Sequence, residues 1–172
     1  MTDGAAGGAP GGAARKTAAR GAFNPHAPIL LRDECEVAAP PEVVWRVLLD
    51  VEGWPRWHRG IDFAALRGGA VPGASLTWKA DGMRIVSLLV EVDEPNRVGW
   101  TIRTFGARGY QRWTLAAWPE GRTRVRLEES WEGLAVRILR GTLRRTLRLS
   151  REEWMAGLSR AVRRVDAVEE PS

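Results

Sequence analysis

Between residues 61 and 131, short apolar runs alternate with polar positions, and turn signals separate them. Gly, Pro, Asp and Asn cluster at 68–73, 81–82, 94–96, 106–109 and 119–121. Runs rich in β-branched and aromatic residues between such turns are typical of antiparallel strands. The pattern predicts six strands, at 61–67, 74–80, 83–93, 97–105, 109–118 and 122–131.

A seventh strand and two short helices are predicted before this region. Over 29–38, Leu31, Cys35 and Val37 share one face, as in a strand with one buried side. Pro41 suits the first turn of a helix, which we expect to run to about residue 50. Gly53 is expected to break it, and a second short helix is expected to open at 55 and include 57 and 58.

A long helix is predicted over residues 142–168. Leu143, Leu147, Trp154, Leu158, Val162 and Val165 recur at helical spacing. Residues 150–153 read Ser-Arg-Glu-Glu, a capping box from which a helix can restart. Because the apolar stripe keeps its phase through Ser150, we expect one continuous helix.

This order of elements predicts an α+β domain in which a seven-stranded antiparallel sheet wraps around the C-terminal helix. A cavity for an apolar molecule is expected between the two. We place the domain at residues 27–170 and expect residues 1–26, rich in Gly and Ala, to be a flexible tail.

Alternation within the strands predicts which side chains point inward. Gln111 and Trp113 share the inward face of one strand, and Leu127, Glu129 and Trp131 share that of the next. In 83–93 the wholly apolar set is Val86, Leu88, Val90 and Val92. A slip of one residue would reverse each assignment.

Two sequence blocks resemble the START-like, or helix-grip, superfamily in its polyketide cyclase/dehydrase-like branch. They are Val37–Trp45 (VAAPPEVVW) and Asp50–Trp57 (DVEGWPRW), and RTRV at 122–125 with Glu128, Glu129 and Gly133 adds to them. The resemblance covers about 29–168. It implies a deep pocket for lipids, sterols, quinones, polyketides or aromatic compounds, and it carries no universal catalytic motif.

Composition limits the cellular compartment and the kinds of bound group that we expect. The chain has a formal net charge of +5 and one cysteine, Cys35, so no internal disulfide forms. It has no apolar run long enough for a transmembrane helix and no apolar segment typical of a signal peptide, so we expect a cytoplasmic protein. Two distant histidines give no metal-ligand spacing, and we expect neither a metal nor a cofactor.

Glu129 is the main candidate for chemistry. A carboxyl group in an apolar pocket has a raised pKa, which suits proton transfer in cyclisation or dehydration of a β-keto chain. The alternative is a rim carboxylate paired with an arginine, and Glu128 takes the role if the register slips. Gln111 is expected to bond a ligand carbonyl, or else nearby backbone.

Several other residues are candidates for the site on less direct evidence. His58 is a possible acid or base, although a surface histidine is the commoner case. Tyr110 and Arg112 point inward only if a bulge occurs at Gly109. Flat aromatic and apolar walls suit planar ligands. The expected lining residues, each of which alternatively only fills the core, are Trp57, Trp78, Trp100, Trp113, Trp131, Val90 and Leu158.

Nine arginines lie in the final predicted helix and in the residues just before it. We expect them on its outer face as a basic ridge, which is either simply solvated or binds an acidic carrier protein or an anionic membrane surface through Arg140, Arg144, Arg145 and Arg148. Nucleic acid is disfavoured because no exposed aromatic platform accompanies the charges. The ridge comprises Arg137, Arg140, Arg144, Arg145, Arg148, Arg151, Arg160, Arg163 and Arg164.

Three functions follow as hypotheses. The first is a cofactor-independent cyclase/dehydratase, or chaperone, for a small apolar carbonyl compound. The second is a non-catalytic carrier or sensor of a lipid or quinone. The third is an interaction module that acts through the basic helix and has a filled core. Either a monomer or a homodimer is compatible with the sequence.

Overall fold

A computed structural model describes residues 23–104 and 106–169. Its elements follow the predicted order, with one added short helix. They are β1 (Ile29–Val37), α2 (Pro41–Leu49), the 3-10 helix η1 (Val51–Arg56), β2 (Ile61–Arg67), β3 (Ser75–Ala80), β4 (Met83–Asp93), β5 (Arg97–Thr104), β6 (Ala107–Trp118), β7 (Arg122–Glu132), α3 (Leu134–Ile138) and α4 (Arg140–Glu169).

The seven strands form one antiparallel sheet in the order β1-β7-β6-β5-β4-β3-β2. β2 to β7 form a meander, in which each strand pairs with the next strand along the chain. β1 pairs with β7, so that β1 and β2 form the two edges of the sheet. Gln111 lies directly opposite Glu129 in the register of β6 and β7, and both line the space toward α4, the inward direction that the alternation predicted.

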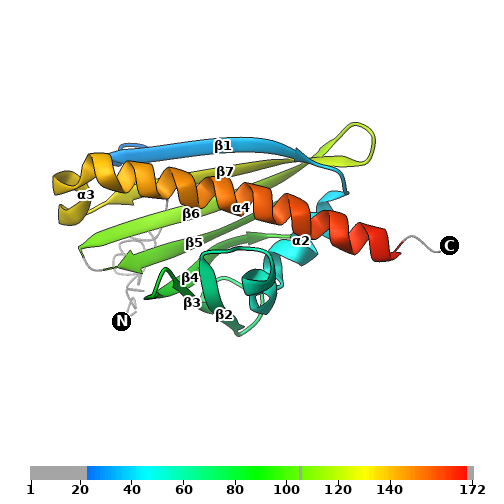
Figure 1. Ribbon diagram of the computed structural model, residues 1–172, viewed down its shortest axis with the longest axis horizontal. Coiled ribbons are helices and arrows are strands. Elements are labelled where there is room, and N and C mark those ends of the chain that lie inside the picture. Colours follow the sequence, from blue (N-terminus) through cyan, green and yellow to red (C-terminus); the bar gives the residue numbers. More distant parts are fainter. Residues whose placement is uncertain (1–22, 105, 170–172) are drawn as a thin grey trace, which may run out of the picture.

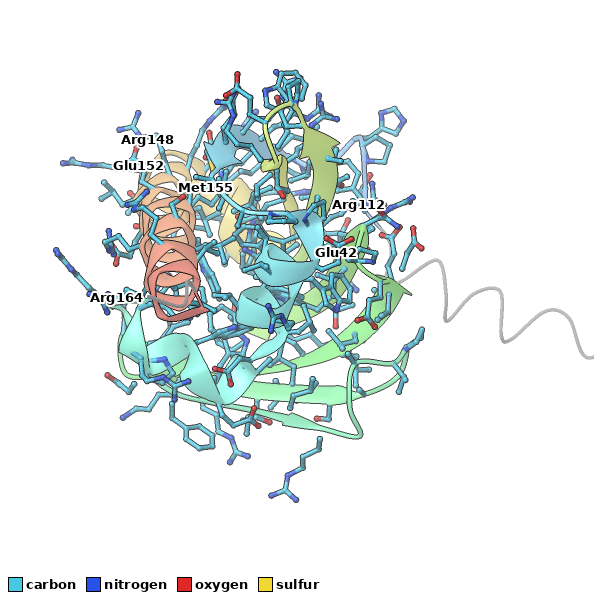
Figure 2. The ribbon with its side chains drawn as sticks, turned by 90° about the vertical axis from the view of Figure 1, so that its right-hand side faces the viewer. Glu42, Arg112, Arg148, Glu152, Met155 and Arg164 are labelled. Carbon is cyan, nitrogen blue, oxygen red and sulfur yellow. The ribbon has the colours of Figure 1, made fainter. Side chains whose placement is uncertain are left out.

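Helix α4 lies along the sheet, which curves around it (Figure 1). It is continuous through Ser150, so the capping box does not start a new helix. Its predicted apolar stripe is buried at Trp154, Leu158 and Val162. Figure 2 shows α4 nearly end-on, with Arg148 and Arg164 projecting away from the sheet. The sheet and helix therefore bury their apolar faces against each other, which is the main stabilising contribution to such a layer.

The segment after β1 closes one end of this layer. Pro41 stands at the start of α2, where its missing N–H leaves no hydrogen bond unmade. The second short helix differs from the prediction, because η1 begins at Val51 and contains both Gly53 and Pro55. A Cβ at Gly53 would overlap the Asp50 carboxylate, so glycine permits the tight turn here where it was expected to break a helix.

Strand β4 exposes the opposite face from the one expected. Ile85 and Leu89 point inward and are buried, whereas Val86 and Leu88 are exposed and Val90 is 38% exposed. Alternation favoured the wrong face because the exposed set is wholly apolar, whereas the inward set includes Ser87, which is buried and accepts a hydrogen bond from Trp78 Nε1. A bulge between 89 and 91 shifts the register, so that Val92 packs against the core as predicted.

The described chain begins before β1 with a turn that contacts the sheet. The Phe23 ring packs edge-on against Tyr110, with ring centroids 6.3 Å apart. The backbone N–H of Asn24 donates to Ser130 Oγ at 3.1 Å. Residues 1–22 of the expected tail lie outside the described residues.

Gly157 sets how closely α4 approaches η1. A Cβ at this position would lie 2.7 Å from the carbonyl oxygen of Trp57 and 2.9 Å from its ring. Gly157→Ala is therefore expected to lower the free energy of unfolding by about 1–2 kcal/mol, despite the better helix propensity of Ala. Chemical denaturation measures this loss.

Gly141 provides the matched control in the same helix. A Cβ there would meet no atom within 4 Å. Gly141→Ala is expected to leave stability unchanged or raise it by up to about 1 kcal/mol. Equal effects of the two substitutions would show that the approach of α4 to η1 does not depend on Gly157.

Candidate functional site

A cavity of about 150 Å³ lies between the sheet and the first half of α4. Its walls come from β3 to β7, α3 and α4, and they are mostly apolar. This space is the size of engineered cavities that hold one benzene ring. The lining residues are Trp78, Ala80, Asp81, Met83, Ile85, Ile102, Thr104, Ala107, Gln111, Glu129, Trp131, Val136, Leu143, Thr146, Leu147, Ser150 and Trp154.

Glu129 and Gln111 together form the polar part of this wall. They face each other across β7 and β6, and both are buried. Gln111 Nε2 donates to Glu129 Oε1 at 3.1 Å, and Trp131 Nε1 donates to Glu129 Oε2 at 2.9 Å. These bonds fix the carboxyl group against the cavity, so the structure brings together the two residues that the sequence singled out for chemistry.

The environment of Glu129 raises its pKa toward neutral pH. Burial raises the pKa of Glu129 to about 7, the hydrogen bond from Trp131 and the charge of Arg151 act in the opposite direction, and Asp33 adds to the rise. A carboxyl group with a pKa near 7 is present in both protonation states at neutral pH. It is therefore suited both to take up and to donate a proton.

Gln111 retains hydrogen-bonding capacity. Its Oε1 is buried and has no partner among the described residues. Its amide nitrogen carries two hydrogens, of which Glu129 accepts one. The side chain can therefore offer a hydrogen bond to a polar group in the cavity while it still holds Glu129.

Two of the five predicted lining tryptophans, Trp78 and Trp131, reach the cavity. Trp57, Trp100 and Trp113 are buried in the core beside it. They pack around Trp154 of α4, which was expected only as part of the helical stripe and also lines the cavity. The ring centroids of Trp54, Trp57, Trp78, Trp100 and Trp113 all lie within 6.5 Å of that of Trp154.

Three further expectations about the cavity are corrected. Val90 points to the outer face of the sheet, because the inward register of β4 is the one that carries Ile85 and Leu89. Leu158 is fully buried, one turn of α4 beyond Trp154, and does not line the cavity. His58 is buried against the Trp154 ring, with centroids 4.5 Å apart, and also lies outside the lining.

The burial of His58 has an electrostatic consequence. Burial lowers the pKa of its imidazole, and the charge of Glu153 only partly offsets this. The ring is therefore neutral at neutral pH. Its Nδ1 accepts the backbone N–H of Gly60 at 3.2 Å, and its Nε2 is buried without a partner among the described residues.

Tyr110 and Arg112 point outward, because β6 pairs with β5 without a bulge at Gly109. Both donate to Glu91 Oε2 at 2.9 Å. These bonds lower the pKa of Glu91, although burial opposes them. Glu128 also faces outward and accepts from Arg32 at 2.8 Å. The register has thus not slipped, and Glu129, unlike the exposed Asp81, is a buried carboxyl group of the cavity wall.

Arg151 is the clearest correction within the basic ridge. Its side chain points inward, is 2% exposed and pairs with Asp33 of β1. Trp154, Ser150 and Thr146 were likewise not anticipated as site residues. The helical stripe would have indicated Trp154 and Leu147, since both lie on the face toward the sheet. It would also have indicated Arg151, because this residue lies between them at helical spacing, four residues after Leu147 and three before Trp154.

The described ranges lack two further features, a cluster of metal ligands and a membrane-spanning helix. Across 23–104 and 106–169, no cluster of three or more His, Cys, Asp or Glu side chains is placed to hold a metal ion. None of the described helices is long and apolar enough to cross a membrane.

Solved structures of other proteins share this fold. A START superfamily protein from Mycobacterium smegmatis is 15% identical, covers 79% of this chain and 98% of its own, and has a TM-score of 0.66. The Zhui aromatase/cyclase from Streptomyces sp. R1128 is 18% identical over 83% and 99%, with a TM-score of 0.72. A di-domain ARO/CYC protein of the steffimycin biosynthetic pathway is 19% identical over 80% and 46%, with a TM-score of 0.61.

Comparison of the sequence with curated proteins and with family profiles gives one match. No curated protein matches the chain. The profile of the family described as "Polyketide cyclase / dehydrase and lipid transport" matches residues 28–165, which is nearly the whole described domain. The chain therefore belongs to the polyketide cyclase/dehydrase and lipid transport family.

Proposed function

We propose that this protein binds a small, apolar, carbonyl-bearing molecule in the cavity and catalyses cyclisation or dehydration without a cofactor. One observation carries the proposal: among the described residues of the lining, Glu129 is the one buried carboxyl group, and its pKa is raised to about 7. The family and the aromatase/cyclase neighbours support a polyketide-related ligand.

Glu129 acts as base and then as acid in this proposal. Its carboxylate removes a proton from the carbon next to a ligand carbonyl, and Gln111 donates its second amide hydrogen to that carbonyl oxygen. The carbanion attacks a second carbonyl of the same ligand, and Glu129 returns the proton to the resulting alkoxide. Removal of a further α-proton expels hydroxide, which leaves with that proton as water and regenerates the carboxylate.

The size of the cavity limits the substrate. At about 150 Å³ it is smaller than the roughly 300 Å³ from which ligand pockets usually begin. The proposal therefore favours a ligand of about one ring over a long acyl chain. Holding such a ligand folded between Trp78, Trp131 and Trp154 brings its reacting atoms together, which supplies part of the rate acceleration.

A carrier or sensor of a lipid or quinone is the second candidate. The apolar wall supports it, since Glu129 is the single ionisable group buried in the lining. Binding without proton transfer would favour this candidate. The third hypothesis required a filled core, and the cavity argues against it.

We also propose that the exposed arginines of α4 bind an anionic partner. Arg140, Arg144, Arg145 and Arg148 are exposed, as expected. Their charge supports an anionic partner, either an acidic carrier protein that delivers the substrate or an anionic membrane surface.

Proton transfer is testable with acetophenone, a ketone with one ring and an exchangeable methyl group. In D₂O the protein is expected to accelerate exchange of the methyl protons, measured by ¹H NMR. Glu129→Gln should reduce this acceleration by about 100-fold or more, because the amide cannot take up the proton. The rate should rise with pH through about 7, since the ionised form of Glu129 is the base.

Glu128→Gln is the matched control, because Glu128 is the neighbouring carboxylate on the outer face of β7. It should leave the exchange rate unchanged. Acetophenone that binds without accelerated exchange would rule out the catalytic proposal and leave the carrier. Equal loss in both variants would show that Glu129 is not the base.

The raised pKa of Glu129 also predicts a pH dependence of stability. The folded state holds the proton up to about pH 7, whereas the unfolded chain releases it near the ordinary value of 4.5. This group therefore stabilises the fold fully below pH 4.5, and the stabilisation is lost as pH rises to 7, by up to about 3 kcal/mol.

Urea denaturation of the wild type and Glu129→Gln at pH 4.5 and 8 measures this effect. Gln has no proton to lose, so the variant should gain stability relative to the wild type at pH 8. The difference between the two proteins cancels the other titrating groups. A difference that is the same at both pH values would mean that Glu129 ionises normally in the fold.

Ala107 provides a way to fill the cavity without touching the polar pair. Its methyl group lines the cavity from β6 and is buried. Ala107→Leu is expected to weaken acetophenone binding about tenfold or more, because the added methylenes occupy the ligand's space. Tryptophan fluorescence or calorimetry measures the affinity, and unchanged affinity would place the ligand outside this cavity.

A further inference from the structure

A second hollow lies between the edge strand β1 and the first half of α4. It has a volume of about 510 Å³ and shares no lining residue with the cavity that holds Glu129. We call it the arginine groove. It is lined by Leu30, Leu31, Arg32, Asp33, Gly141, Arg144, Arg145, Arg148 and Arg151.

The groove carries a large excess of positive charge. Five of its lining residues are arginines and one, Asp33, is acidic. Arg32 is paired with Glu128, and Arg148 lies 3.8 Å from Glu152. Such a concentration of one sign in a concave surface attracts anions strongly.

Two arginines of the groove have no countercharge. Arg144 and Arg145 are exposed and form no ion pair with any residue in the described part of the chain. They are adjacent in sequence in the first turns of α4, close to Gly141, which also lines the groove. Their guanidinium groups are therefore available to a ligand.

Arg151 provides the independent indication that the groove takes a ligand. It is 2% exposed, and its one ion pair, with Asp33, engages a single nitrogen. Its Nε and Nη1 are buried without a hydrogen-bond partner among the described residues. Buried guanidinium donors without acceptors are costly and uncommon, so this side chain is short of acceptor oxygens.

We propose that the arginine groove binds a phosphate monoester, with Arg151 at its base and Arg144 and Arg148 at its rim. A phosphate group offers three acceptor oxygens and up to two negative charges, and the guanidinium fork matches its geometry. Several arginines can therefore bind one phosphate at once. A carboxylate has only two oxygens and one charge to share among them.

The surroundings of the groove favour an ester with an apolar group. A further hollow of about 320 Å³ adjoins it and is lined by Phe23, Pro25, Leu30, Leu31 and Arg32. Leu30, Leu31 and Arg32 line both spaces. The organic part of the ester would lie against Leu30 while its phosphate binds the arginines. This site does not depend on the chemistry proposed for Glu129.

Isothermal titration calorimetry with phenyl phosphate and inorganic phosphate tests the proposal. Phenyl phosphate is expected to bind more tightly, and binding should weaken as salt is added. Arg144→Gln and Arg148→Gln should each weaken binding about tenfold, the usual loss for a hydrogen bond to a charged group.

Arg163→Gln and Arg164→Gln are the matched controls. Both positions are exposed on the same helix and lie outside the groove, and each control removes the same charge. They should leave the affinity unchanged. No binding of either phosphate, or equal weakening by control and groove variants, would overturn the proposal.

Arg151→Lys tests the base of the groove. It keeps the charge toward Asp33 but removes the guanidinium fork, so phosphate binding should weaken while the melting temperature stays close to that of the wild type. If this variant unfolds, Arg144→Gln and Arg148→Gln still decide the question. A folded Arg151→Lys variant that binds phenyl phosphate like the wild type would overturn the role given to Arg151.

Vesicles distinguish a free ester from a lipid headgroup. Phosphatidic acid carries a phosphate monoester, and phosphatidylcholine vesicles serve as the control. Cosedimentation with phosphatidic acid that phenyl phosphate displaces and that Arg148→Gln weakens would identify a lipid as a source. No cosedimentation, together with phenyl phosphate binding, would identify a free ester. Vesicle binding that ignores both the competitor and the groove variants, without phenyl phosphate binding, would overturn the proposal.

Discussion

The packing of Trp154 against the sheet is the contact on which the rest of this structure depends. Its indole lies at the centre of a cluster of aromatic rings from η1 and three strands. A buried tryptophan contributes a large apolar surface in a fixed shape. The cluster therefore fixes the position of α4 relative to the sheet. Gly157, one turn further along, lets η1 approach the helix closely.

The same contact decides where empty space remains. The rings fill the layer beyond Trp154, whereas the first half of α4 presents the smaller side chains of Leu143, Leu147 and Ser150. A cavity consequently remains on that side, between these residues and β3 to β7. Glu129 lies in its wall, held by a cross-strand amide and an indole N–H, so its protonation depends on a layer that is otherwise apolar.

Arg151 lies in the wall of the arginine groove and acts electrostatically on the cavity. It lines the arginine groove, pairs with Asp33 at the edge strand, and its charge lowers the pKa of Glu129. Occupation of the groove by an anion would weaken that influence and raise the pKa of Glu129 further. The charge on one face of the helix and the proton in the cavity are thus electrostatically linked through a single buried side chain.

The sequence by itself determined the order of the elements, the continuity of α4 and the inward register of β6 and β7, since alternating or helical apolar spacing specifies one buried face. It therefore predicted that Gln111 and Glu129 face the helix together. Around Val90 the wholly apolar set of side chains is the exposed one, and Arg151 was grouped with the exposed arginines of the helix, so both directions were predicted wrongly. Only the tertiary structure decided these cases, because strand pairing and the position of α4 on the sheet choose which side chains are buried.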